Sequence, residues 1–571
     1  MQEKLDLFQR RLIRLFWKVA EEKEEIAVDG VKGYNSEAQF TNGKVINLCS
    51  YVALNLLTET GEKEKGFQAL RQVIHFTARM KMETWGILNA IEGIYRLYRA
   101  GRLAAAVDEE TRSLLRKSLN WRSFVDENTL ELIHKPTNYY GVAFGIARYR
   151  ELLGWEPVKY SELLLNRLMD HISRYSGEEG FMDETPGFGR FDRYSILIPA
   201  EITALVLDTL WQEPELMRTM LNRSAHIVLQ LANKAGTGFS YGRSIGAYGE
   251  SAVLQILSTA MALGGIFTPK EEQIAYGYCC RVLARMIDFW YDEEMRSVNM
   301  WEKGRKTDGY RNKNRILGEN VSLSMQMIGA MEQWKARGYG WKGEPENWEQ
   351  LLHTLPPYSV TFFTKKPLPR CLIIVRDGDT VWQLPIVHGG EEYADRDPYL
   401  PVPRANFVLE AVPDASHCAW VPRFEMKDGA VLIPAGYIEA VAVAPIEGGC
   451  RVKLRQIDLL PVGKRPVGAV RGACIETTYS FQKGGVQRED AVSMDEAFCQ
   501  RVSRVRLICE IMKGKLTAFG YDGKTQKTYE QANENNVCLD TPHGPCTQIV
   551  EFVKAVCPED RSMKMAWRLR A

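Results

Sequence analysis

The sequence lacks a charge imbalance and lacks any long hydrophobic run. Its 571 residues hold 73 Lys and Arg against 72 Asp and Glu, which leaves a formal net charge of +1. This balance, without a basic run interleaved with aromatics, argues against nucleic acid or an anionic membrane surface as a partner. No stretch reaches the roughly 18 apolar residues of a membrane-spanning helix. Residues 1–24 carry charges throughout instead of the apolar core of a signal peptide, so we expect a cytoplasmic protein.

Metal and cofactor motifs are missing as well. The twelve cysteines form no CxxC pair, and the eight histidines include no HExxH. Several cysteines lie in apolar runs, as Cys371 does, which favours buried free thiols over disulfides or zinc ligands. The glycine-rich stretch at 236–242 follows a predicted helix and not a strand, which argues against a dinucleotide or phosphate loop. We therefore expect no metal and no cofactor.

The sequence does contain a repeated pattern of six short polar or aromatic signatures, each just ahead of an amphipathic helical segment. Their spacing of 43 to 71 residues leaves room for two helices and their loops, which predicts repeated helical hairpins. If alternate helices form an inner ring, their N-termini open on one face and favour an anionic ligand. The signatures are Thr41-Asn42, Thr84-Trp85, Thr137-Asn138, Asp192-Arg193-Tyr194, Tyr248-Gly249-Glu250 and Gly318-Glu319.

The chain divides into a helical part and a strand part. Twelve segments with helical periodicity make six hairpins, which agrees with the six signatures and predicts an (α/α)6 toroid over residues 1–340. Residues 341–357 are rich in Gly and Pro and form the expected linker. Beyond them, β-branched runs separated by turns such as Asp377-Gly378 and Asp428-Gly429 predict an antiparallel β-sandwich over residues 358–571. The helical segments lie near 4–22, 43–59, 66–80, 85–100, 109–120, 138–154, 159–176, 194–212, 214–235, 249–265, 270–291 and 319–336.

Four carboxylates lie in or beside the glycine-rich loops that precede the predicted inner helices. Carboxylates at the mouth of a pocket can transfer protons to and from a bound ligand. Asp192 and Glu250 are the first candidates for a catalytic pair, and Asp183 and Glu319 are the substitutes. Tyr194, two residues after Asp192, is a further catalytic candidate, as a base that could abstract a proton. The alternative is a tight surface loop whose aromatics pack back onto the helices.

Other side chains near these loops are candidates for binding a ligand. Arg243 offers a planar fork of donors that suits a carboxylate, although a simple ion pair with a nearby acid is equally open. Aromatic rings suit stacking on a sugar, but each can also be a core residue. The remaining candidates for substrate contacts are Tyr241, Tyr248, Asn138, Tyr139, Trp85, Arg190, Arg311 and His388.

Several of these stretches resemble a bacterial family long catalogued as a domain of unknown function. Some proteins similar to that family are exo-acting β-glucuronidases. A helical toroid followed by an antiparallel sandwich is also the layout of heparinase II/III-like polysaccharide lyases, a more distant resemblance. The stretches are Gly180-Phe181-Met182-Asp183, Phe191-Asp192-Arg193-Tyr194, Tyr241-Gly242-Arg243-Ser244 and Gly318-Glu319.

Residues and resemblance together predict an enzyme for acidic oligosaccharides. The first hypothesis is a glycoside hydrolase that removes a terminal uronic acid, β-glucuronic acid foremost, with two carboxylates as acid and base. The second is a lyase that cleaves by β-elimination, in which Tyr194, Tyr248 or His388 abstracts a proton while Asn138 or Arg243 neutralises the uronate. The third is a glycan-binding protein without catalysis. A homo-oligomer is possible under all three.

Overall fold

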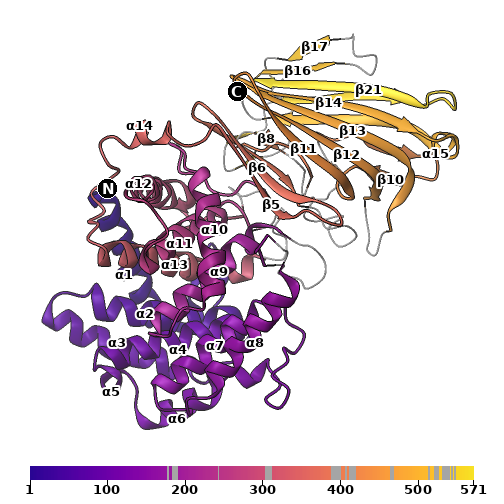
Figure 1. Cartoon of the computed structure of the whole chain (residues 1–571). Coiled ribbons are helices and arrows are strands. Elements are labelled where there is room, and N and C mark those ends of the chain that lie inside the picture. The colour runs from indigo at the N-terminus through magenta and orange to yellow at the C-terminus, as the bar shows by residue number, and fades with distance from the viewer. Residues whose placement is uncertain are drawn as a thin grey trace.

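The computed structural model describes most of the chain. The described residues are 1–176, 179–182, 191–241, 244–301, 312–387, 400–405, 408–409, 420–462, 468–511, 515–519, 526–529, 540–541, 544–545 and 548–570. Helices occupy the N-terminal part and antiparallel strands the C-terminal part, as the sequence predicts (Figure 1). None of the helices in the described ranges combines the length and the apolar character needed to cross a bilayer.

Six helices contact one another in a closed cycle, which we call the inner ring. Each contacts the next in chain order, and the last contacts the first. Several are buried on nearly every side; the first eight residues of α11 are all buried. The inner ring consists of α2 (Gln39–Asn55), α4 (Thr84–Arg99), α7 (Tyr139–Leu152), α9 (Arg193–Asp208), α11 (Ala247–Leu263) and α13 (Ile316–Ala336).

A second set of helices packs outside the inner ring. Each contacts an inner helix adjacent to it in the chain, α6 through the hydrogen bond from Arg150 of α7 to the carbonyl of Arg116. These helices are amphipathic: in α1, Leu5, Phe8, Leu12, Phe16 and Val19 recur at three- and four-residue intervals and are buried. The outer helices are α1 (Gln2–Glu22), α3 (Thr60–Thr77), α6 (Glu109–Ser118), α8 (Tyr160–Tyr175), α10 (Glu215–Gln230) and α12 (Pro269–Arg285), with the short α5 (Leu103–Ala106) beside α3 and α4.

The twelve long helices lie where periodicity predicts them, with differences at the ends. The segment expected to run to residue 291 leaves the α-helical path at Arg285 and continues as a π-helical turn, η3 (Met286–Trp290). The expected linker contains a short helix, α14 (Trp348–Leu352), that packs on α12. Its Trp348 is buried and donates a hydrogen bond of 3.0 Å to the carbonyl of Ile274, so this stretch is anchored to the helices.

A three-stranded sheet lies between the helices and the remaining strands (Figure 1). Its strands are β5 (Tyr358–Thr364), β6 (Arg370–Asp377) and β7 (Thr380–Ile386), and the β6–β7 turn contains Gly378 at φ +59°. In β6, Leu372 and Ile374 belong to the core of the helical part, whereas Cys371 and Ile373 belong to the core of the strand part. Both faces of β6 are therefore covered, which explains its unbroken apolar run.

The largest sheet is antiparallel throughout. Its strands follow the order β17-β16-β21-β14-β13-β12-β10-β9-β15-β20, with β11 paired to β12 and β8 to β15. Along most of β12 to β14, buried residues alternate with exposed or half-buried ones, as in a sheet with one side in solvent. The strands are β8 (Val408–Leu409), β9 (Arg423–Met426), β10 (Val431–Ile433), β11 (Ile438–Ile446), β12 (Gly449–Pro461), β13 (Val470–Gln482), β14 (Gly485–Met494), β15 (Val502–Ile511), β16 (Lys515–Phe519), β17 (Gln526–Tyr529), β20 (Gln548–Ala555) and β21 (Ser562–Arg570).

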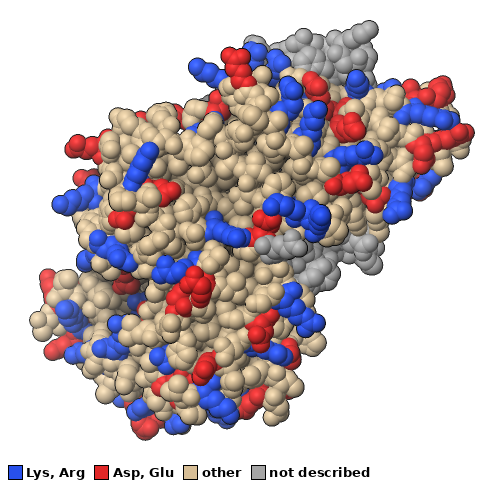
Figure 2. Space-filling view, in the orientation of Figure 1, with Lys and Arg blue, Asp and Glu red and all other residues tan. Residues whose placement is uncertain are grey.

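Smaller elements complete the fold. The hairpin turn predicted at Asp428-Gly429 connects β9 to β10, with Gly429 at φ +88°. Short two-stranded pairs not foreseen from the sequence are β1 (Ala27–Val28) with β2 (Val31–Lys32), β3 (Tyr291–Asp292) with β4 (Ser297–Val298), and β18 (Asp540–Thr541) with β19 (Gly544–Pro545). Helix α15 (Glu496–Arg501) precedes β15. Acidic and basic side chains are interspersed over the face shown in Figure 2, as the balanced composition suggests.

Candidate functional site

The six signatures meet at one end of the inner ring. Each marks the start of an inner helix, and neighbouring helices touch through these first turns, so their N-terminal ends gather together. The contacts are the close approach of Gly43 to Gly86, the rings of Trp85 and Tyr139 at 6.2 Å, the hydroxyls of Tyr194 and Ser244 at 3.0 Å, the bond from Tyr248 to Glu319, and the close approach of Gly318 to Thr41. Helices α7 and α9 also contact each other. Burial raises the pKa of Tyr139 at the start of α7, and Glu83 and, to a smaller extent, Tyr194 raise it further.

Glu319 lies at the end of the inner ring where the six helices begin, and it contacts both a hydroxyl donor and a cation. It lies fully buried in the first turn of α13 and accepts a hydrogen bond from the hydroxyl of Tyr248 on α11. The guanidinium Nε of Arg315 lies 3.4 Å from its other oxygen. One turn further along α13, Lys44 of α2 donates a hydrogen bond of 2.6 Å to Ser322. Glu319 therefore has a hydroxyl donor in Tyr248 and a cation in Arg315.

Two cations share one aromatic ring beside this carboxylate. The Nζ of Lys44 lies 3.1 Å and the Cζ of Arg315 lies 3.4 Å from the ring centroid of Phe40. Lys44 is buried although lysine is rarely buried without compensation, and the ring face and Ser322 supply that compensation. The sequence pointed to neither Lys44 nor Phe40 as a site residue. A lysine four residues after a phenylalanine, inside a helix that is otherwise nearly all buried, is the signal that could have found them.

Asp192 lies across α11 from Glu319. It is the N-cap of α9, is fully buried, and its Oδ1 accepts a hydrogen bond of 2.8 Å from the backbone N–H of Tyr194. Burial raises the pKa of Tyr241 far above its usual range, and the neighbouring Asp192 raises it further. The cap therefore fixes the carboxylate at the start of α9, in the neighbourhood of Tyr241.

Two aromatic rings and an amide side chain lie at the same end of the inner ring, at the starts of α4 and α7: Trp85, Tyr139 and Asn138. The ring of Tyr139 packs edge-on against Trp85 and lies 6.4 Å from Phe124. Asn138 is only 8 % exposed, and its Oδ1 has no hydrogen-bond partner among the described residues. A buried amide oxygen without a donor requires a water or a ligand group to complete it.

The structure does not bring Glu250 to this group. Residues 248 and 250 of a helix point about 200° apart, so Tyr248 faces α13 while Glu250 faces the outer layer. There the carboxylate accepts hydrogen bonds of 2.7 Å from both Arg285 and the indole of Trp290. Burial raises the pKa of Glu250 to about 7, although Arg285 opposes the shift. Glu250 therefore lies between the inner ring and the outer helices, and not with the residues gathered where the inner helices begin.

Five of the predicted site residues lie outside the described residues, and their roles stay predictions. They are Asp183, Arg190, Arg243, Arg311 and His388.

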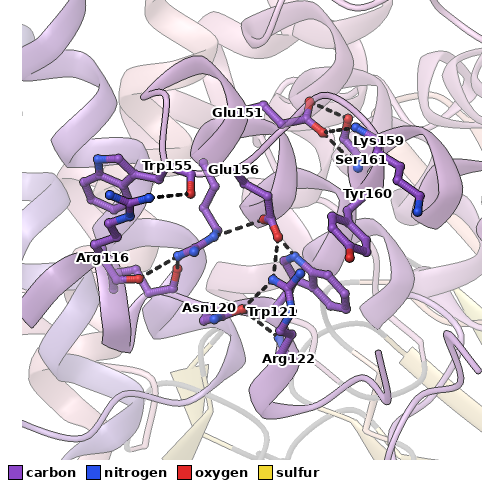
Figure 3. Close-up of polar contacts among 12 residues, drawn as sticks. Arg116, Asn120, Trp121, Arg122, Glu151, Trp155, Glu156, Lys159, Tyr160 and Ser161 are labelled. Carbon is purple, nitrogen blue, oxygen red and sulfur yellow. Dashed lines mark hydrogen bonds and ion pairs between the residues drawn. The ribbon is translucent and has the colours of Figure 1, made fainter. Parts of the chain in front are cut away.

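A second group of buried charges lies at the other end of α7 and serves the fold (Figure 3). Glu156 accepts hydrogen bonds of 3.1 Å from both Arg150 and the indole of Trp121, and it pairs with Arg122. Arg150 also donates to the carbonyls of Arg116 and Leu119 at 2.8 and 2.7 Å. Because these partners satisfy one another, the group joins α6 to the α7–α8 turn and leaves little for a ligand to complete.

Comparisons with known proteins identify no family. No protein-family model matches the chain, and no curated protein matches it. Among solved structures, one named as heparinase III is similar at 10 % sequence identity, over 97 % of this chain and 88 % of that chain, with a TM-score of 0.23. A TM-score this low does not establish a shared fold, so the function has to come from the chemistry of the site.

Proposed function

We propose that the protein is a carbohydrate-active enzyme that removes a terminal uronic acid, β-glucuronic acid foremost, from oligosaccharides by hydrolysis. In this proposal the inner ring and its outer helices form an (α/α)6 toroid, and the substrate binds where the six inner helices begin. The observation that carries it is the placement of two buried carboxylates, Asp192 and Glu319, at the starts of helices on either side of α11. Glycoside hydrolysis requires two such groups.

The neighbours of these carboxylates suit an acidic sugar. Trp85, Tyr139 and Tyr194 are half-buried rings at the same end, and ring faces stack on the apolar faces of sugars. The cations Lys44 and Arg315, together with the partial positive charge of the helix N-termini, favour an anionic substituent. A uronic acid supplies both features in one residue.

The surroundings of each carboxylate suggest different roles. We assign Glu319, which accepts from Tyr248 and lies 3.4 Å from the Nε of Arg315, the role of base or nucleophile. Asp192 accepts the backbone N–H of Tyr194 through Oδ1, which holds the carboxyl group at the start of α9. We assign Asp192 the second role, that of the acid that protonates the leaving oxygen.

One contact favours β-elimination as the second candidate. The hydroxyl of Tyr248 donates to Glu319, so that carboxylate can accept the phenol proton while the phenolate oxygen takes the proton at C5 of the uronic acid. The electron pair of that C–H bond forms the new double bond, and the glycosidic oxygen leaves with its bonding pair. Asn138 or Arg243 would stabilise the uronate during this step.

A panel of uronic-acid oligosaccharides, read by mass spectrometry and ultraviolet absorbance, tests the proposal. Hydrolysis gives two products whose combined mass exceeds that of the substrate by one water and which gain no absorbance. Elimination gives products of unchanged combined mass, one of which carries an absorbing double bond, and this outcome replaces the first mechanism with the second. Binding without any product would leave a glycan-binding protein and overturn both.

A further inference from the structure

One side chain of the three-stranded sheet holds the main chain of a loop that leads into the candidate site. The amide of Gln383 in β7 donates from Nε2 to the carbonyl of Gly238 at 3.0 Å, and its Oε1 accepts from the backbone N–H of Ser240 at 3.2 Å. Gln383 is buried. Gln383 thus donates one hydrogen bond to the loop and accepts one from it, as the backbone of a neighbouring strand would. A carboxamide can do both because it carries an N–H donor and a carbonyl acceptor side by side.

The opposite side of the same loop rests directly on α11. A Cβ added at Gly238 would overlap the carbonyl of Gly249, and one added at Gly249 would lie 2.8 Å from the carbonyl oxygen of Phe239. The loop is therefore held between the first turn of α11 and β7, backbone against backbone on one side and against Gln383 on the other. It has no room to shift toward the helix.

This loop carries residues of the site. Tyr241 is fully buried, and its hydroxyl has no hydrogen-bond partner among the described residues. Ser244, at φ +52°, meets the hydroxyl of Tyr194 at 3.0 Å, and Tyr248 follows one turn later. Tyr241 follows directly after Ser240, so the position of the loop sets Tyr241 relative to Asp192.

Gln383 is itself held rigidly. Its backbone N–H and carbonyl both pair with Arg404, at 2.8 Å in each direction. On the adjacent strand β6, Arg376 donates to the carbonyls of Gln230 and Ala232 at 2.9 Å, where α10 ends. The sheet thus contacts the segment that joins α10 to α11 at two separate points.

We propose that Gln383 is a positioning residue of the active site: it acts through the Gly238–Ser240 main chain to hold Tyr241 in place. The expected effect on turnover rests on the proposed function, whereas the fixing of the loop by Gln383 does not. Without the carboxamide the loop loses both bonds on its sheet side, and small displacements of groups around a reacting sugar slow turnover strongly.

The test compares Gln383→Met with Arg376→Met, a matched control that removes the other side-chain bridge from the same sheet. Hydrogen exchange of peptides covering residues 238–241 and, on an accepted substrate, kcat and KM are measured. In Gln383→Met we expect loop exchange to quicken about 5- to 10-fold, as for the loss of one hydrogen bond. We expect kcat to fall about 10- to 100-fold with KM nearly unchanged. Arg376→Met should lower the melting temperature but change neither the loop exchange nor kcat.

The outcomes separate this inference from the proposed function. Unchanged loop exchange in Gln383→Met overturns the inference whatever the enzyme does. Faster exchange with normal kcat shows that Gln383 holds the loop but does not position the reaction, which also overturns it. A lack of turnover by the unmodified protein on every substrate refutes the proposed function, and the exchange measurement still decides whether Gln383 holds the loop. Gln383→Glu keeps the bond from Ser240 only and serves as the second variant if Gln383→Met does not fold.

Discussion

Glu250 and Glu319 both lie in the first turn of an inner helix, yet their neighbours differ in kind. Glu319 meets a tyrosine hydroxyl and cations that surround the ring end, whereas Glu250 meets an arginine and an indole of the outer layer. Burial and sequence position are the same for the two. The direction in which each helix turns its side chain thus decides whether the carboxylate lies at the candidate site or in the outer layer.

Substitutions at the carboxylates and at Tyr248 distinguish the two candidate reactions. For a hydrolase, Asp192→Asn and Glu319→Gln keep the shape but remove proton transfer, so turnover should fall at least about 100-fold with binding retained. Tyr248→Phe should then have the smaller effect. For a lyase the order reverses, and Tyr248→Phe becomes the most damaging. Steady-state kinetics on one accepted substrate decide it, and near-normal turnover of Asp192→Asn would remove that residue from the mechanism.

Glu250 should make stability depend on pH. Its pKa in the folded protein, about 7, lies above its ordinary value of 4.5. Below pH 4.5 the carboxyl is protonated in both states; as pH rises toward 7 the unfolded chain releases the proton first, so folding stability falls. Relative to Glu250→Gln, the free energy of unfolding should therefore drop by about 3 kcal/mol between pH 4.5 and pH 8. Denaturant unfolding of both proteins across this range measures it, and parallel curves would show that Arg285 cancels the effect of burial.

Glu156 should matter for stability and not for turnover. Replacing Glu156 with Gln leaves the buried Arg150 without its counter-charge, at a cost of about 3 kcal/mol in unfolding free energy. The exposed pair of Arg79 and Glu110 provides the control, because Glu110→Gln should cost less than about 1 kcal/mol. Equal losses in the two variants would mean that burial adds nothing to the Glu156 contacts.

At the scale of elements, glycines set how closely the inner helices approach. A Cβ at Gly43 of α2 would overlap the carbonyl of Gly86 in α4, and one at Gly93 would lie 2.8 Å from the Cα of Asn47. Two such points on one helix pair bring backbones into contact over several turns. The first of them lies directly beside Trp85, so the spacing of α2 and α4 also sets one side of the candidate site.

Alanine substitutions test this close packing. Gly43→Ala must push α2 away from α4 and should destabilise the protein by about 1–3 kcal/mol. Gly329→Ala, in α13 with nothing within 4 Å of the added Cβ, should instead be stabilising by about 0.5–1 kcal/mol. Melting temperatures of the two variants should move in opposite directions, and a neutral Gly43→Ala would show that the helices can separate freely.

Element types and their order could be predicted because they depend on local patterns. The 3.6-residue periodicity placed the long helices, and Asp377-Gly378 placed a hairpin. Periodicity could not show where α12 becomes the π-helical turn η3, because apolar residues continue through the turn at Met286, Ile287, Phe289 and Trp290. Nor could it show that Glu250 turns away from the mouth, since the direction of a side chain depends on the helix start to within one residue.

At the scale of the molecule, contacts between distant segments were beyond reach from the sequence. Gln383 and Gly238 lie 145 residues apart in sequence, and nothing in either segment indicates the other. Lys44 and Ser322 are separated even further and meet only because the last inner helix closes on the first. Spacing arguments predicted that six helix starts would gather, but which residues touch follows from the packing of the assembled ring.

The two-faced strand β6 has a consequence for how the protein comes apart. Its alternate residues belong to the core of the helical part and to the core of the strand part. If either core unfolds, β6 loses the packing on one of its two faces, and the other core is weakened as well. Large chains of two parts commonly unfold in separate steps. Here we expect differential scanning calorimetry to record one heat-absorption peak, with helix and strand signals in circular dichroism lost at the same temperature. Ile373→Ala, which weakens only the strand-side face, should lower that single temperature for both signals. Two resolved peaks would mean that β6 can leave one partner and stay with the other.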